Sequence, residues 1–159
     1  QLAPASLEES LPPAVAGQKG VSLEVGEDLP LVMTDPGMLE RVVANLVANA
    51  VRFSAGKPVR ILAHETPDTV EVLIVDQGPG VPEAQRGRMF EPFQRLDDSS
   101  SGGLGLGLAV ARGLGEAIGV RITAEDTPGG GLTMVLVVPR AVVSTGSTTE
   151  STDERSVNG

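Results

Sequence analysis

Residues 35–52 most constrain how this chain can fold, because their apolar side chains recur three and four positions apart. That spacing predicts an amphipathic α-helix with one apolar stripe, made of Leu39, Val42, Val43, Leu46, Val47 and Ala50. Asp35 suits the N-cap of this helix and Pro36 suits its first position. A helix with one apolar face needs a second layer to cover that face.

The remaining patterns supply that layer. Short apolar runs between turn residues predict strands at residues 21–25, 29–33, 59–65, 70–75, 120–125 and 132–138. We expect the first two runs to pair with each other and the third and fourth to form a hairpin. Further helices are predicted at residues 7–16, with Ser6 as N-cap, and at residues 104–118. The sequence therefore predicts an α/β two-layer sandwich, with a mixed sheet of about five strands and three helices on one face.

Length and composition allow one domain with a tail. The 159 residues, 40% of them apolar, are enough for a single core, which we place in residues 1–140. Residues 77–103 are mostly irregular, with a helical turn near 82–89, and residues 141–159 are expected to be a disordered Ser/Thr/Glu-rich tail. The net charge of −9 without a basic cluster argues against nucleic acid as a partner.

No apolar run is long enough to cross a bilayer, so this segment is not expected to be embedded in a membrane. The chain begins without Met, and we expect it to be part of a longer protein whose other parts could reach a membrane. Without cysteine, it has neither disulfides nor thiolate metal sites.

Three clusters of residues carry the candidate chemistry. In the first, Asn45, Asn49 and Arg52 share one arc of the predicted helix, with Asn49 at the edge of the apolar stripe and half-buried. An amide oxygen there could bind Mg²⁺ that phosphates already neutralise, and Arg52 could reach a phosphate. Alternatively, the two asparagines only border the solvent face.

In the second cluster, Asp76 follows a largely buried strand and precedes Gly78 and Gly80. A buried carboxylate needs hydrogen-bond donors, and the exocyclic amine of adenine is one. The two glycines would let a flat base approach the backbone. A simple Asp-Gly turn is the alternative.

In the third cluster, Gly103, Gly105 and Gly107 lead into a helix, whose unpaired amides could bind an anion. The spacing matches neither the dinucleotide fingerprint nor the Walker loop, because Leu108 takes the place of a third glycine and no Gly-Lys-Ser/Thr follows. A flexible hinge is the alternative.

Together with Phe90-Glu-Pro-Phe93, these clusters occur in the order of the asparagine, first glycine, phenylalanine and second glycine boxes. Over about residues 5–140 the chain resembles the ATP-binding domain of histidine kinases, a branch of the superfamily of gyrase, heat-shock chaperone and MutL ATPases. The segments 91–95 and 127–135 most resemble the potassium-responsive KdpD branch.

The resemblance implies a Bergerat-type fold and a role for each matching residue. Asn49 would bind Mg²⁺ with Asn45 beside it, and residues 94–102 would form a lid from which Arg95 reaches the terminal phosphate of ATP. Asp76 would contact the adenine amine. The other implied nucleotide contacts are Arg52, Phe53, Gly78, Gly80, Gly103, Gly105, Gly107 and Leu108.

The implied function is to bind Mg·ATP and pass its γ-phosphoryl group to a histidine on a separate dimerisation domain. A response regulator would follow downstream, and the parent protein would lie in the bacterial inner membrane with this domain in the cytoplasm. Potassium or osmotic sensing is the expected input.

Some positions depart from the family pattern. Relatives that hydrolyse ATP carry Glu where this chain has Asn45, which favours transfer over hydrolysis. His64 lies in a predicted strand and is expected to be an ordinary sheet residue, not the phosphoacceptor. Leu132 stands where many relatives have Ser or Thr near the base, and the lid is short and serine-rich. The alternatives are an ATPase that uses the nucleotide as a conformational clamp (an ATPase clamp), a serine kinase that acts on a regulatory protein, and a non-catalytic protein-binding module.

Overall fold

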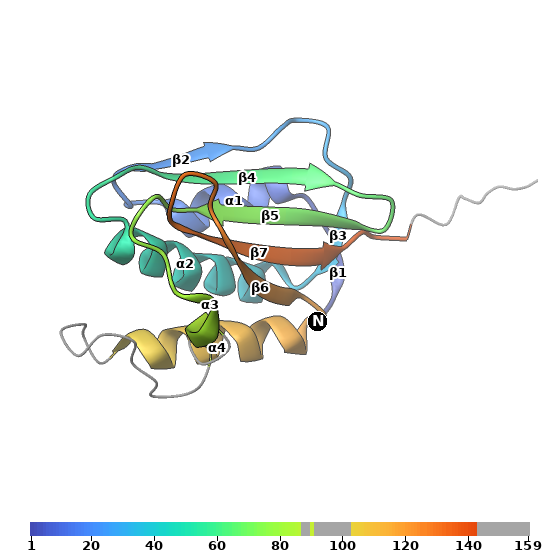
Figure 1. Ribbon diagram of the computed structural model, residues 1–159. Coiled ribbons are helices and arrows are strands. Elements are labelled where there is room, and N and C mark those ends of the chain that lie inside the picture. The colour runs from blue at the N-terminus through green and yellow to red at the C-terminus, as the bar shows by residue number, and fades with distance from the viewer. Residues whose placement is uncertain (87–89, 91–102, 143–159) are drawn as a thin grey trace, which may run out of the picture.

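A five-stranded sheet and three helices form the two layers of this chain (Figure 1). The structure is a computed structural model that describes residues 1–86, 90 and 103–142; for residues 86 and 103–107 it describes only the backbone. The strand order is β2-β4-β5-β7-β6, and a separate two-stranded sheet pairs β1 with β3. The strands are β1 (Ala3–Ala5), β2 (Val21–Glu24), β3 (Val32–Thr34), β4 (Val59–Glu65), β5 (Thr69–Val75), β6 (Arg121–Asp126) and β7 (Leu132–Pro139). The helices are α1 (Leu7–Val15), α2 (Pro36–Phe53), α3 (Glu83–Arg86) and α4 (Gly103–Ala117). These findings confirm the predicted fold class.

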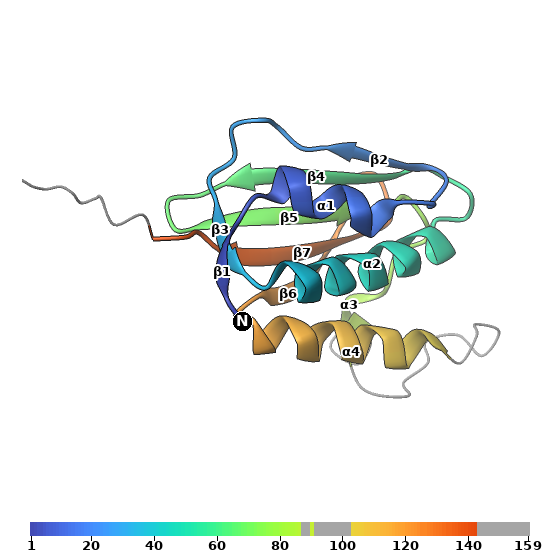
Figure 2. The ribbon, with the colours of Figure 1, turned by 180° about the vertical axis from the view of Figure 1, so that it is seen from behind.

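The three long helices α1, α2 and α4 cover one face of the large sheet, with α2 between the other two (Figures 1 and 2). All six residues of the predicted α2 stripe are buried in the core, as the periodicity required. Asp35 caps the helix as expected, because its Oδ1 accepts a hydrogen bond of 3.1 Å from the backbone N–H of Met38. Ser6 occupies the N-cap position of α1 without a side-chain cap, and its hydroxyl lies 3.3 Å from Glu8 Oε1 instead.

The predicted pairing of residues 21–25 with residues 29–33 is wrong. β2 runs parallel to β4 at one edge of the sheet, where Val21 and Leu23 pack on the core. β3 pairs antiparallel with β1 and places Val32 and Thr34 fully inside. The Ala-Pro-Ala sequence of β1 has little intrinsic strand preference, so local patterning could not supply the correct partner.

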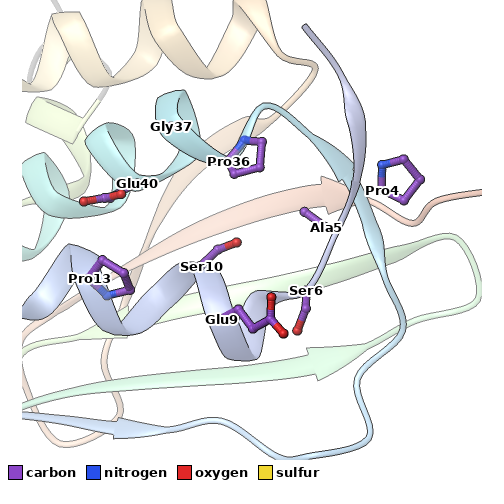
Figure 3. A pocket seen from close by; sticks show the side chains of 9 residues that line it. All are labelled: Pro4, Ala5, Ser6, Glu9, Ser10, Pro13, Pro36, Gly37 and Glu40. Atoms are coloured by element: carbon purple, nitrogen blue, oxygen red, sulfur yellow. The ribbon is translucent and has the colours of Figure 1, made fainter.

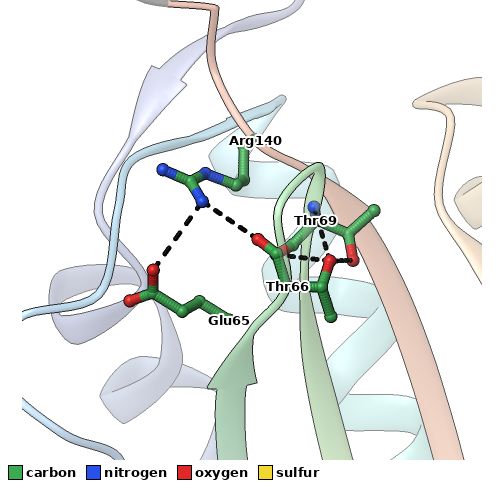
Figure 4. A network of polar contacts seen from close by, with 4 residues as sticks. All are labelled: Glu65, Thr66, Thr69 and Arg140. Carbon is green, nitrogen blue, oxygen red and sulfur yellow. Dashed lines mark hydrogen bonds and ion pairs between the residues drawn. The ribbon is translucent and has the colours of Figure 1, made fainter.

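The hairpin of β4 and β5 is confirmed, and its turn is tied to the end of β7 (Figure 4). Thr66 Oγ1 accepts a bond of 2.9 Å from the Thr69 N–H and lies 2.6 Å from the Thr69 hydroxyl. Arg140 donates 2.9 Å to the Thr66 carbonyl and lies 3.7 Å from the Glu65 carboxylate. The last residues of the sheet are therefore held by polar contacts across three strands.

Within the described residues, no helix combines the length and apolar character needed to cross a membrane. Of the expected tail, the structure describes only residues 141 and 142, so its predicted disorder lies outside the described part of the chain.

The buried stripe of α2 should dominate stability. Leu46→Ala removes a fully buried side chain and is expected to lower the free energy of unfolding by about 3 kcal/mol. Leu31→Ala, the same change at a side chain that is 46% exposed, should cost less than about 1 kcal/mol. Urea unfolding followed by circular dichroism measures both values, and equal losses would contradict the assignment of α2 to the core.

Candidate functional site

The C-terminal half of α2 presents the asparagine cluster at the border of the core. Asn45 and Asn49 are half-buried, Arg52 is exposed, and Phe53 ends the helix and packs partly on the core. The half-burial predicted for Asn49 is confirmed. The helix keeps Asn45 and Asn49 about one turn apart, so the two residues lie on the same face of α2.

Asp76 lies directly beyond β5 and is only 5% exposed. Its Oδ1 accepts two backbone hydrogen bonds, from the N–H of Gly78 at 3.0 Å and from that of Leu132 at 3.1 Å. Burial raises the pKa of this carboxyl group, although the two amide donors act in the opposite direction. Among the described residues, no donor reaches the second oxygen, which leaves it able to accept a bond from a ligand.

Gly78 joins this carboxylate to the end of α2. A Cβ at Gly78 would collide with the backbone carbonyl of Phe53, so the loop after Asp76 rests against the last turn of the helix. That Gly78 also lets a base approach the backbone, as expected from the sequence, stays a prediction. The structure shows a further reason for glycine here, the close backbone packing that places Asp76 beside α2.

Two other glycines allow a second close contact, between the residues after β5 and the turn before β7. Gly80 has φ near +80°, and a Cβ there would lie 3.3 Å from the Gly131 carbonyl oxygen. Gly131 has φ near +113°, and its missing Cβ makes room for the Asp76 backbone. Sequence reasoning missed Gly131, although the run of three glycines at 129–131 marked an unusual backbone.

The third predicted cluster lies in α4, which begins at Gly103, so the glycines form its first turns instead of preceding it. The backbone N–H groups in the first turn of a helix have no intrahelical partner, and here they include those of residues 103–105. Leu108 is buried in the core, so a contact between its side chain and a nucleotide stays a prediction. In Figures 1 and 2 the start of α4, the C-terminal end of α2 and the end of β5 lie on the same side of the molecule.

Phe90 is a core residue, 8% exposed, and the Arg112 guanidinium of α4 lies 5.1 Å from the centre of its ring. This geometry allows a cation–π interaction. Phe90 is thus a core residue through which the Phe90–Phe93 segment contacts α4. Phe93, Arg95 and the predicted lid at residues 94–102 lie outside the described residues.

His64 behaves as the ordinary sheet residue that the sequence predicted. It is exposed on β4 opposite Glu71 of β5, and its Nε2 lies 3.0 Å from the Glu71 carboxylate.

A cavity of about 370 Å³ lies elsewhere, between β1, α1 and the N-terminal end of α2 (Figure 3). Its charged lining side chains, Glu9 and Glu40, are both acidic and would repel a polyphosphate. The cavity also lies at the opposite end of α2 from Asn49 and Phe53. It is therefore no candidate for the nucleotide.

Residues 34–142 match the family described as histidine kinase-, DNA gyrase B- and HSP90-like ATPases. The chain belongs to this family. A histidine-kinase-type domain is also what the curated relatives indicate. The chain is 44% identical over 140 residues to the sensor protein KdpD of Rathayibacter rathayi, covering 85% of this chain and 16% of that protein. It is 45% identical over 122 residues to the KdpD sensor protein of Mycobacterium tuberculosis strain CDC 1551, covering 76% of this chain and 14% of that protein.

Solved structures agree with this histidine-kinase-type ATPase domain. The catalytic domain of histidine kinase ThkA superposes with a TM-score of 0.75 at 21% identity, covering 88% of this chain and 96% of that one, which shows the shared fold. Full-length ShkA in complex with AMPPNP superposes with a TM-score of 0.73 at 30% identity, covering 89% of this chain and 32% of that one. The resemblance to histidine kinases and to the KdpD branch is confirmed.

The role assigned to Gly78 can be tested by adding one methyl group. Gly78→Ala would drive a Cβ into the Phe53 carbonyl, and we expect a loss of about 1–3 kcal/mol in the free energy of unfolding. Gly113→Ala, inside α4 with open space around it, should instead stabilise the domain by about 0.5–1 kcal/mol. Denaturant titration measures both, and a neutral Gly78→Ala would refute the close contact.

Proposed function

We propose that this domain binds Mg·ATP where the end of α2, the residues after β5 and the start of α4 meet. One observation carries the proposal: the Asp76 carboxylate is buried, accepts two backbone amides on one oxygen, and lies next to α2 through Gly78. A buried acid with one oxygen still able to accept fits the exocyclic amine of adenine.

The neighbouring residues suit the rest of the nucleotide. Phe53 would pack against the nucleoside, and Arg52 and the first amides of α4 would contact phosphates. Among the described residues, no group of three or more His, Cys, Asp or Glu could hold a metal. Asn49, with Asn45 beside it, instead offers uncharged oxygen, which suits Mg²⁺ that arrives with phosphates and keeps several waters. When bound, Mg²⁺ would neutralise phosphate charge.

The reaction we propose is phosphoryl transfer to a histidine of another domain. The bond between the γ-phosphorus and the β–γ bridging oxygen breaks, a bond from phosphorus to an imidazole nitrogen forms, ADP leaves, and the imidazole gives up its proton. The described residues contribute mainly by positioning and electrostatics. Asn45 cannot act as a general base, which favours transfer over hydrolysis. Arg95 would contact the terminal phosphate.

The wider setting follows from the relatives. The chain spans only 14–16% of the KdpD sensor proteins it matches, so the whole protein's activity is part of this proposal. We propose that the parent is a sensor kinase of the bacterial inner membrane that responds to potassium or osmotic conditions, with this domain in the cytoplasm. Its partners would be its own dimerisation domain and a response regulator. One structural neighbour, histidine kinase ThkA, likewise forms a complex with a response regulator, the protein TrrA.

Nucleotide binding is the first test. Asp76→Asn should weaken the affinity for ATP at least tenfold, because the carboxamide is a weaker acceptor than the carboxylate. Asp68→Asn, an exposed site at the tip of the β4–β5 hairpin, should leave the affinity unchanged. Titration of a fluorescent ATP analogue with excess Mg²⁺ measures both. A wild-type domain that binds no nucleotide would leave only a protein-binding module.

Transfer is the second test. Mixed with the dimerisation domain of its parent protein and γ-labelled ATP, the domain should place acid-labile label on a histidine, and alone it should not label itself. Steady ATP hydrolysis by the isolated domain would support the ATPase clamp, and label on serine would support a serine kinase.

The raised pKa of Asp76 should also make the stability of the domain depend on pH. Because burial raises the pKa of Asp76, the folded state binds its proton more tightly than the unfolded state, where the pKa is about 4. The stability contribution of Asp76 is therefore largest at low pH and falls as pH rises through the raised pKa. We expect Asp76→Asn, without ligand, to be as stable as wild type or more so at pH 7, with the difference shrinking toward pH 4. Urea unfolding at several pH values measures this, and a variant less stable only at pH 7 would contradict it.

A further inference from the structure

The antiparallel ladder between β5 and β7 is altered at one place, immediately beyond Val75. By register, Asp76 and Leu132 form the next pair after Val75 and Thr133. In a regular hydrogen-bonded pair, each residue donates its N–H to the other's carbonyl. The Asp76 N–H does donate 3.0 Å to the Leu132 carbonyl, but the Leu132 N–H donates 3.1 Å to the Asp76 carboxylate. The side chain has taken the donor that would serve the Asp76 carbonyl.

A hydroxyl from the next turn replaces that donor. Thr127 Oγ1 donates 3.0 Å to the Asp76 carbonyl, and Thr133 Oγ1 lies 2.8 Å from Thr127 Oγ1. Each hydroxyl has one proton, and that of Thr127 is used on Asp76, so the hydroxyl of Thr133 must donate to Thr127. Both threonines are buried, with 8% and 5% exposure, and a buried polar group without a partner is costly. The direction of this hydrogen-bond chain is thus fixed: Thr133 donates to Thr127, and Thr127 donates to the Asp76 carbonyl.

The turn itself is built to hold Thr127 there. The Thr127 N–H donates 3.0 Å to the Gly131 carbonyl, and the Gly130 N–H donates 2.9 Å to the Thr127 carbonyl. Gly131, with φ near +113°, lets this turn lie directly against the Asp76 backbone. These contacts hold the Thr127 backbone close to the Asp76 backbone, within reach of the hydrogen bond from its hydroxyl.

We propose that Thr127 and Thr133 are positioning residues for base recognition: their hydroxyls occupy the Asp76 carbonyl so that the Leu132 amide stays on the carboxylate and orients it toward the adenine amine. Neither threonine touches the nucleotide in this scheme. Without the Thr127 hydroxyl, the nearest way to satisfy the Asp76 carbonyl is for the Leu132 N–H to return to the regular ladder, which frees the carboxylate to rotate. The inference rests on the proposed function, because it concerns how Asp76 selects adenine.

The test compares ATP with purine riboside 5′-triphosphate, which lacks only the amino group that Asp76 would read. Competition titrations with excess Mg²⁺ give the ratio of the two affinities for each variant. Wild type should prefer ATP, and Thr127→Val should reduce this preference at least threefold. Thr127→Ser, which keeps the hydroxyl, should restore it. Thr123→Val, a matched change at an exposed residue of β6, should leave it unaltered.

Each outcome decides a different point. A Thr127→Val variant that weakens the affinity for both nucleotides equally would show a merely structural role and overturn the inference. In that case, ATP binding by the wild type would still support the proposed site. A wild type that binds neither nucleotide would overturn the proposed function and this inference together. If Thr127→Val does not fold, Thr133→Val serves instead, because it removes the donor to Thr127 and should shift the ratio in the same direction. An unchanged ratio in that variant would overturn the inference.

A readout without nucleotide completes the experiment. When the Leu132 N–H leaves the carboxylate, the pKa of Asp76 should rise above the wild-type value, because that amide lowers it. Carbon-detected NMR titration of the Asp76 carboxyl group in wild type and Thr127→Val measures the change. An identical pKa in both proteins would contradict the proposed exchange of donors.

Discussion

The two backbone hydrogen bonds to Oδ1 of Asp76 are the interaction on which the geometry of the candidate site depends. A carboxylate with 5% exposure would be strongly unfavourable without them, and they come from two different segments, the loop after β5 and the start of β7. The acid is therefore also a structural link, which fixes how the end of the sheet meets the loop. Its remaining oxygen provides the chemistry that a bound base could use.

Close backbone packing then sets the distance from this link to the helices. Because Gly78 has no Cβ, the loop carrying it lies on the carbonyl of Phe53 and so on the end of α2. The stripe of α2 is anchored in the core, so Asn45 and Asn49 cannot move relative to the sheet without disturbing that stripe. The amides of α2 and the acid after β5 are thus held by the same core that makes the domain stable, and α4 packs beside α2 from the other side.

The parts of the fold with a strong local period could be predicted from the sequence. The helix of residues 35–52 and the hairpin of β4 and β5 follow from spacing and turn residues alone, and the order of the polar clusters was enough to indicate the family. The pairing of β1 with β3 and of β2 with β4 could not be predicted, because Ala3–Ala5 has no strand pattern and the parallel partner of β2 lies 38 positions further along the chain. For the site, Asp76 and Gly78 could be singled out from the sequence, but the close packing of Gly78 on the Phe53 carbonyl could not. Thr127 and Thr133 were missed because their role depends on a ladder bond that the side chain of another residue displaces.

The most direct test of the central claim is amide NMR of the isotope-labelled domain during titration with Mg²⁺ and a non-hydrolysable ATP analogue. If the groups converge on one nucleotide, the amides of Asn49, Gly78 and Leu132 should shift together with one saturation curve, while those of Glu9 and Glu40 at the separate cavity stay in place. Shifts centred on Glu9 and Glu40, or different saturation curves for Asn49 and Gly78, would contradict a single site formed by α2, the end of β5 and α4.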